Sequence, residues 1–404
     1  MPILKRKKLA LTFVTLCITV AAFAQTSALR AQLENSQSLS AVAPQSDQAG
    51  VLWAWRDNEG LALSHLSSKN SSKITGAFLQ HRLSANGEVV AALEKFVGNE
   101  TRADKSGLML RWFASEGRML GAHHLAWHGD DPLPQFALNH SGSHVMALQP
   151  ATAHIAFLNQ TAELLKEGVL FDNAPYSNER PAFLAADANH FYVLSQSIPH
   201  TTQQASAPAL ICFSLEGKEQ WRRELQSGMA GNLAISPSGN WLLANRYEVA
   251  NTSVQASTVI FDAQGRQHTE LSSLFRAASF SVDEKSALLI DRRQVRCIDL
   301  PSREILWQSD LKSREEMFAA AARHSQTWLA LVARSTFKQN RFVYEKARVR
   351  GWNSKGQQQF ELAVAHDLIA PILVASPEAP QFLLAADGVL LQYKIFAGPQ
   401  SKVE

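Results

Sequence analysis

A short pattern of apolar residues, a tight polar turn and further apolar residues recurs along most of the chain. It is clearest at residues 234–244, which read AISPSGNWLLA. Gly accepts the positive φ of such a turn, and Ser, Asn or Asp closes it through local hydrogen bonds. The seven copies have turns centred near Asn86, Ser141, Ala188, Ser238, Asp283, Ser325 and Glu378. Their spacing of about 40 to 58 residues is the period of propeller blades.

A second hairpin follows most copies of the first. Residues 259–269, VIFDAQGRQHT, show its common form: an apolar residue, a small polar residue, two further residues and Gly. A polar residue at the first turn position and Gly at the fourth suit a type I turn, and strong β-formers flank it. Each repeat therefore predicts four short strands. Four-stranded units at this period indicate an all-β protein with a β-propeller fold.

The predicted propeller has seven four-stranded blades. Val51–Leu66 has no inner hairpin before it, so we expect N-terminal strands to complete the last blade and close the ring. Closure removes the exposed edges of an open sheet. Eight blades are the alternative, if Val51–Leu66 belongs to a blade of its own. The propeller is expected at residues 50–396, between a flexible linker at 25–49 and a C-terminal tail at 397–404.

The outer hairpin resembles the pyrroloquinoline-quinone-type repeat, whose hallmark is Ala-x-Asp-x-x-x-Gly-x-x-x-Trp. Residues 297–307, CIDLPSREILW, keep Asp299 and Trp307 at that spacing and have Cys297 for Ala. The inner turns are equally similar to those of WD-repeat propellers. The resemblance implies a propeller and no particular activity. It also implies that Trp221 and Trp307 are structural residues that dock one blade against the next.

The N-terminal residues have the composition of an export signal. Basic residues at positions 5–8 precede an apolar run that is short for a membrane span and ends in Ala24. This order predicts a Sec-type signal peptide at residues 1–24, cleaved after Ala24. Leu16 before Cys17 is not the small residue of a lipoprotein signal. The mature protein is expected to be periplasmic or secreted, with no integral membrane span.

The charge balance argues against a nucleic-acid partner. The chain has 39 basic and 36 acidic residues, and the predicted signal contains four of the basic ones and none of the acidic ones. The mature chain is therefore close to neutral and lacks the excess of Lys and Arg that binding to phosphate backbones requires.

Two cysteines, Cys212 and Cys297, remain after the predicted cleavage. They fall on third strands of repeats that are two apart. Such strands are much farther from each other than the roughly 7 Å Cα separation that a disulfide tolerates. We therefore expect two free, buried thiols.

Three neighbouring repeats place an arginine where the second strand is expected to end, namely Arg246, Arg292 and Arg334. These ends are expected on one face, near the central channel. Converging guanidinium groups suit a carboxylate or phosphate ligand. The alternative is that each arginine pairs with a local acid, such as Glu248, Asp291 or Glu345.

Three long connections, at residues 195–209, 246–257 and 334–347, are expected as loops on the same face. Loops of this length are often adapted to binding. The last one places Lys338 and Arg341 beside aromatic residues, a composition common in protein interfaces. The alternative is that these aromatic residues begin an extended third strand.

The segment GAHHLAWHGDDP contains candidate metal ligands: His123, His124, His128 and Asp130. Imidazole and carboxylate groups suit zinc or another divalent ion, but no fixed zinc signature is present. A polar surface connection is the alternative. No cofactor is predicted.

These observations favour an exported, non-catalytic propeller that binds a partner through its loop-rich face. The expected partner is another envelope protein or an anionic small ligand. The competing hypothesis is a periplasmic metal- or quinone-dependent propeller enzyme. The chain has no GxSxG, GxGxxG or phosphate-cradling GxxxxGKS sequence that would indicate another enzyme class.

Overall fold

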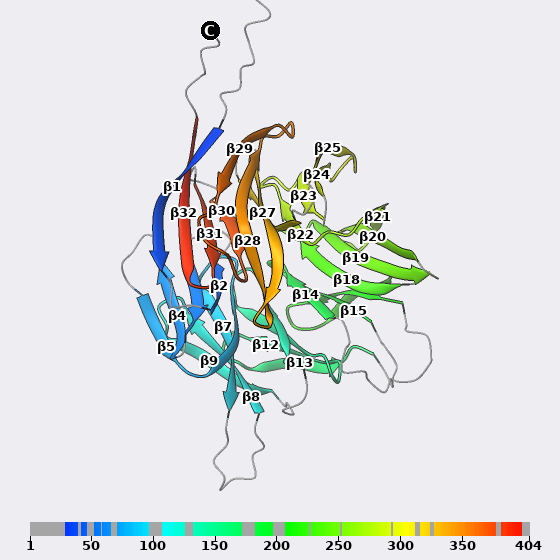
Figure 1. Ribbon diagram of the computed structural model, residues 1–404. Helices are drawn as coiled ribbons and strands as arrows, with labels where there is room; N and C mark the ends of the chain where they lie inside the picture. Colours follow the sequence, from blue (N-terminus) through cyan, green and yellow to red (C-terminus); the bar gives the residue numbers. More distant parts are fainter. Residues whose placement is uncertain are drawn as a thin grey trace, which may run out of the picture.

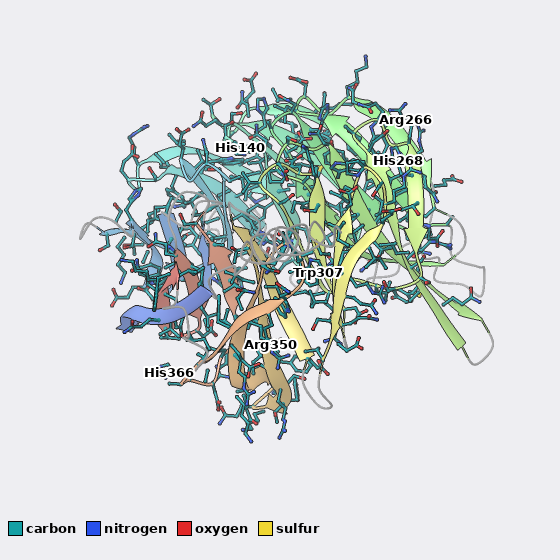
Figure 2. All side chains as sticks on the ribbon, turned by 90° about the horizontal axis from the view of Figure 1, so that it is seen from above. His140, Arg266, His268, Trp307, Arg350 and His366 are labelled. Atoms are coloured by element: carbon teal, nitrogen blue, oxygen red, sulfur yellow. The ribbon has the colours of Figure 1, made fainter. Side chains whose placement is uncertain are left out.

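A computed structural model describes most of the chain as a ring of β-sheets (Figure 1). The described residues are 29–38, 42–46, 52–57, 59–65, 71–96, 107–125, 132–171, 182–196, 207–225, 228–250, 253–291, 294–311, 316–323, 327–376 and 381–397. Within these ranges the strands form eight separate sheets of four strands. Seen from above, the sheets follow one another around the molecule in chain order (Figure 2).

The first four blades contain strands of four to eight residues. Their bounds are β2 Val42–Ser46, β3 Leu52–Arg56, β4 Gly60–His65 and β5 Ser71–Thr75; β6 Phe78–Leu83, β7 Val89–Phe96, β8 Gly107–Ala114 and β9 Met119–Leu125; β10 Gln135–Leu138, β11 His144–Gln149, β12 His154–Asn159 and β13 Leu164–Val169; β14 Ala182–Ala186, β15 His190–Ser195, β16 Ala209–Ser214 and β17 Glu219–Glu224.

The last four blades include the longest strands. Their bounds are β18 Met229–Ile235, β19 Trp241–Ala250, β20 Ser253–Asp262 and β21 Gln267–Leu271; β22 Ala277–Phe280, β23 Ser286–Ile290, β24 Gln294–Asp299 and β25 Ile305–Asp310; β26 Glu316–Arg323, β27 Thr327–Lys338, β28 Arg341–Trp352 and β29 Gln358–Ala363; β30 Ile372–Ala375, β31 Gln381–Ala386, β32 Val389–Ala397 and β1 Leu29–Ser38.

The ring is closed by β1, which adds to the free edge of β32 as an antiparallel partner, from Leu29 opposite Ala397 to Ser38 opposite Val389 (Figure 1). The all-β propeller and its closure by an N-terminal strand are thus confirmed. The count of seven blades is wrong, because β3 and β4 form the middle of a separate blade with β2 and β5. The alternative of eight blades is confirmed.

Part of the expected linker at residues 25–49 is also strand, since it contains β1 and β2. The stretch has few large apolar residues, so no packing pattern predicted strands there. What orders it is backbone pairing with the open edges of β32 and β3. The predicted signal peptide at 1–24 lies outside the described residues, as does the tail from residue 398 onward.

The core lies between neighbouring blades. Both faces of a middle strand are covered over much of its length, so the covered residues are mostly apolar, whereas the outer strands are largely exposed. Between the third and fourth blades, for example, the ring of Phe157 lies 6.0 Å from that of Phe191 and 5.2 Å from that of Phe213. Apolar contact of this kind joins each sheet to the next.

The inner turns form hydrogen bonds from blade to blade. The backbone N–H of Asn86 donates to the carbonyl of His140 at 3.1 Å, and that of His140 donates to Asp187 at 3.0 Å. Further along, the N–H of Ser238, in the turn at residues 234–244, donates to the carboxylate of Glu284 at 2.6 Å. The geometry that these turns share therefore serves the contact between blades.

The tryptophans of two outer strands contact the following blade. The indole N–H of Trp221 donates to the carbonyl of Ala263 at 3.1 Å. Trp307 stacks on Trp352 with ring centroids 6.1 Å apart. Both are mostly or fully covered and act as packing residues. Cys212 and Cys297 are free, buried thiols, as expected.

Removing β1 should open the ring. A chain that begins at residue 40 would expose the full edge of β32, so we expect aggregation and a midpoint of thermal unfolding lower by roughly 5 °C or more. A chain that begins at residue 25 retains β1 and is the control. Equal thermal stability of the two chains would show that β1 does not close the ring.

Gly356 should not tolerate a side chain. Its φ of +76° is left-handed, and an added Cβ would lie 2.4 Å from Cγ of Trp307. We expect Gly356→Ala to lower the free energy of unfolding by about 1–3 kcal/mol. Gly168→Ala is the matched control, since nothing lies within 4 Å of its added Cβ. Urea denaturation measures the free energy of unfolding of both variants. Equal values would show that Trp307 does not pack against Gly356.

Candidate functional site

Two of the three arginines predicted to bind an anion are described, and each lies close to an acidic residue. Arg246 is in the middle of β19, and its guanidinium forms an ion pair with Glu270 at 2.6 Å on the same blade. Arg334 is exposed and lies opposite Glu345 in the β27–β28 pairing. Arg292 lies outside the described part of the chain. Arg246 thus has a local acid as its partner, although Glu270 is an acid that the sequence did not suggest, whereas the ion pair of Glu345 is with Lys338.

Two of the three expected loops are hairpins of extended strands. β19 continues to Ala250 and pairs with β20, and β27 continues to Lys338 and pairs with β28. Gln339 and Asn340 both have positive φ, which a two-residue type I′ turn requires. The alternative of an extended third strand is therefore confirmed for residues 341–347. Most of the third connection, at 195–209, lies outside the described residues.

The β27–β28 hairpin ends in an exposed aromatic pair. Phe337 and Phe342 are opposite each other across the strands, with exposed fractions of 62% and 58%. Their ring centroids are 5.2 Å apart in an edge-to-face arrangement. Lys338 and Arg341 form the next pair toward the turn. We call these four residues the hairpin tip.

Polar contacts hold this hairpin in position. Lys338 forms a hydrogen-bonded ion pair with Glu345, and this hydrogen bond lowers the pKa of the carboxyl group. Two pairs away from the aromatic pair, the backbone of Tyr344 exchanges two hydrogen bonds with Leu368, at 2.8 and 3.0 Å. The hairpin is thereby attached to the connection between β29 and β30.

The predicted metal ligands are only partly described. His123 and His124, on β9, line a cavity of about 160 Å³ together with His154 and Glu167. Nε2 of His154 lies 3.5 Å from a carboxylate oxygen of Glu167. Within the described ranges, no group of three His, Cys, Asp or Glu side chains could hold a metal ion. His128 and Asp130 are outside those ranges.

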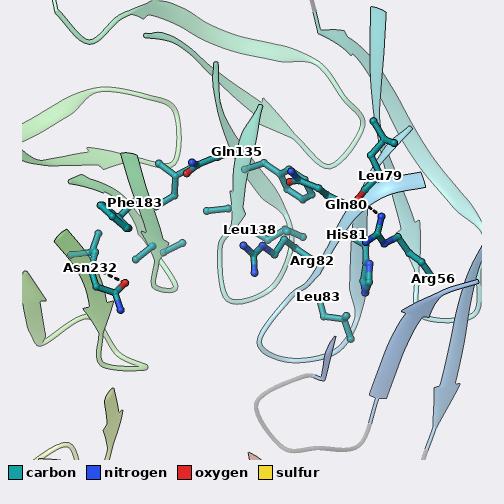
Figure 3. A pocket seen from close by; sticks show the side chains of 16 residues that line it. Arg56, Leu79, Gln80, His81, Arg82, Leu83, Gln135, Leu138, Phe183 and Asn232 are labelled. Carbon is teal, nitrogen blue, oxygen red and sulfur yellow. Dashed lines mark hydrogen bonds between the residues drawn. The ribbon is translucent and has the colours of Figure 1, made fainter. Parts of the chain in front are cut away.

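The central channel contains a larger cavity, of about 690 Å³ (Figure 3). The inner strands β6, β10, β14 and β18 supply most of its walls. Its polar lining consists of Arg56, Gln80, His81, Arg82, Gln135 and Asn232. None of the described residues that line it is Asp or Glu. The cavity is therefore basic, and sequence reasoning did not find it.

The two channel arginines differ in their contacts. Arg56 donates from Nη1 to the carbonyls of Phe78, at 3.2 Å, and Leu79, so it ties the first blade to β6. Burial lowers its pKa, and the charge of Asp387 partly opposes this effect. Arg82 is exposed to the cavity and has no ion pair or hydrogen bond with any described residue. One signal was present in the sequence, because β10, β14 and β18 contain no charged residue and β6 does.

Two polar residues on or beside middle strands have structural roles. Gln196 donates to the carbonyl of Gly228 at 2.8 Å and accepts from the N–H of Ala230 at 3.1 Å. Asn245 donates to the carbonyl of Phe275 at 2.6 Å. These amides fasten the connection that leads into the next blade. In contrast, the side-chain amides of the channel residues Gln80 and Gln135 have no hydrogen-bond partner within the described ranges.

Comparison with known proteins shows the fold of this chain and no more. No protein-family model matches the sequence, and no curated protein matches it. Among solved structures, the C-terminal WD40 domain of Sif2 is similar, with a TM-score of 0.59 and 12% identity over 90% of this chain and 98% of that one. The Dos1 propeller has a TM-score of 0.58 and 10% identity over 90% and 94%. At these identities the likeness shows the fold alone, a WD40-like propeller. It does not support the pyrroloquinoline-quinone-type resemblance. No helix among the described residues is long and apolar enough to cross a membrane.

His81 should make stability depend on pH. Burial lowers its pKa from 6.5 to about 4, and its Nε2 lies 3.3 Å from the carbonyl of Ala54. Between these pH values the unfolded state binds more protons than the folded state. The free energy of unfolding should therefore fall by roughly 3 kcal/mol for this group as the pH decreases from 7 to 4.

Chemical denaturation between pH 4 and pH 7 measures this effect. His81→Gln cannot titrate, so its stability should decrease less over this range. His366→Gln, at an exposed histidine, should keep the slope of the unaltered protein. If the free energy of unfolding changes equally with pH in all three proteins, His81 is not the group responsible.

Proposed function

We propose that the protein is an exported, non-catalytic propeller that binds a protein of the cell envelope through the hairpin tip. The observation that carries this proposal is the exposed pair of Phe337 and Phe342 at the end of a projecting hairpin. Aromatic residues are enriched in the buried centres of protein interfaces. A partner that covers both rings would remove apolar surface from water.

The backbone beside the hairpin tip is held by regular pairing. Cross-strand pairing places the two rings in contact, and the two hydrogen bonds between Tyr344 and Leu368 attach β28 to the next connection. A rigid surface loses less conformational entropy on binding than a flexible loop does. The fold itself, a WD40-like propeller, provides the scaffold.

Charge suggests the chemistry of the partner. Lys338 and Arg341 flank the rings. Glu345 pairs with Lys338, on which the charge of Asp367 also acts, whereas Arg341 forms no ion pair with any described residue. A complementary surface would combine an apolar pocket with carboxylate groups at its rim. Export rests on the predicted signal peptide at residues 1–24, which places such a partner in the envelope.

The double variant Phe337→Ser/Phe342→Ser should lose its partner. Affinity capture from an envelope extract, compared by quantitative mass spectrometry, should show at least about tenfold less of the proteins retained by the unaltered chain. The fold should be unaffected, because both side chains are exposed.

The control is Ile305→Ser/Leu306→Ser, which alters two exposed apolar residues on the outer strand β25. It should capture the same proteins as the unaltered chain. If the hairpin-tip variant also captures them undiminished, or if both double variants lose them equally, the proposed binding surface is wrong.

A further inference from the structure

We propose that the central channel is a second binding site, in which Arg82 holds the carboxylate or phosphate group of a small organic anion. This site is separate from the hairpin tip and does not depend on the proposed protein partner. Three observations lead to it. Arg82 has no ion-pair partner among the described residues, the described lining contains no Asp or Glu, and the amides of Gln80 and Gln135 have no described hydrogen-bond partner.

Arg82, which is exposed to the cavity, differs from two arginines that pair with acids. Arg111 pairs with Glu94 at 2.9 Å, and Arg350 pairs with Glu361 at 2.6 Å. Arg82 has no such partner within the described ranges, although channel walls surround it and lower its pKa by desolvation. A guanidinium in this setting is free to form two parallel hydrogen bonds with a carboxylate or phosphate.

The electrostatic environment favours an anion. Arg56 and Arg82 both line the cavity, and no Asp or Glu is among its described lining residues. Asp387 acts on Arg56 through its charge, but it does not line the cavity. Attraction between charges is stronger in a partly enclosed channel than in open water. Binding of an anion would therefore be most favourable beside Arg82.

The remaining lining suits an organic ligand. The amides of Gln80 and Gln135 can donate to further oxygen atoms, and neither has a described partner (Figure 3). Leu138 and Phe183 supply apolar surface. The volume of about 690 Å³ is within the range of small-molecule sites.

Titration calorimetry of the mature-length chain at low ionic strength tests the site. The probes are succinate, inorganic phosphate and, as the uncharged counterpart, succinamide. We expect one of the two anions to bind, succinamide not to bind, and Arg82→Gln to weaken the bound anion at least tenfold. Gln135→Leu should weaken binding of the same anion several-fold. This variant tests the site while Arg82 is left intact.

Two control variants separate this site from other effects. Arg341→Gln removes an exposed cation at the hairpin tip and should leave anion binding unchanged, as should Phe337→Ser/Phe342→Ser. Binding of neither anion would overturn the proposal. So would equal anion binding by Arg82→Gln and the unaltered chain, since that result would indicate a general charge effect. A selective preference for succinate or for phosphate identifies the class of ligand.

Discussion

The antiparallel pairing of β1 with β32 is the contact on which the rest of the ring depends. Each blade buries its two faces against its neighbours, so a ring with a gap would leave two faces uncovered. At the closure, Trp53 of the first blade is almost fully buried against Leu383 and Leu390 of the last. β1 supplies the fourth strand of that last blade. The closing pair contributes mainly through its backbone, which explains how a polar segment can occupy the position.

Closure also determines where polar residues can be used. In a closed ring the inner strands surround one channel, so side chains from blades that are distant in sequence share a cavity. The middle strands are covered on both faces and are apolar. Polar side chains therefore gather at strand ends, in turns and along the channel. Gln196 and Asn245 hold the connections between blades through their side-chain amides. Among the described residues, the channel residue Arg82 has no comparable partner.

Much of the fold was predictable from the sequence, because it repeats. Local turn chemistry at positions such as Ser238 and Gly265 predicted the hairpins, and repetition predicted the propeller. The first blade was not counted because β2 lies in a stretch without alternating apolar residues. This strand forms by pairing with β3, and its own sequence does not indicate that pairing. The free thiols at Cys212 and Cys297 were predictable, since the repeat gave each a place in the ring.

The candidate sites were harder to predict. The sequence indicated that Arg246 lies near the end of a strand, but β19 continues past it and Glu270 engages its guanidinium. Arg82 was overlooked although most of the inner strands, such as β10, β14 and β18, contain no charged residue. Whether an arginine is paired depends on side-chain directions across strands, and bulges such as that between Phe78 and Gln80 change these directions.

The closure by β1 has a consequence for the order of folding. The two strands of the closing pair come from opposite ends of the chain, so the ring cannot be completed until residue 397 has been synthesised. Contacts between such distant segments form slowly, because a large loss of chain entropy precedes them. An unfinished chain therefore stays open at one edge. Such a delay suits a polypeptide that has to be threaded across a membrane before it folds, which is the route that its first 24 residues predict.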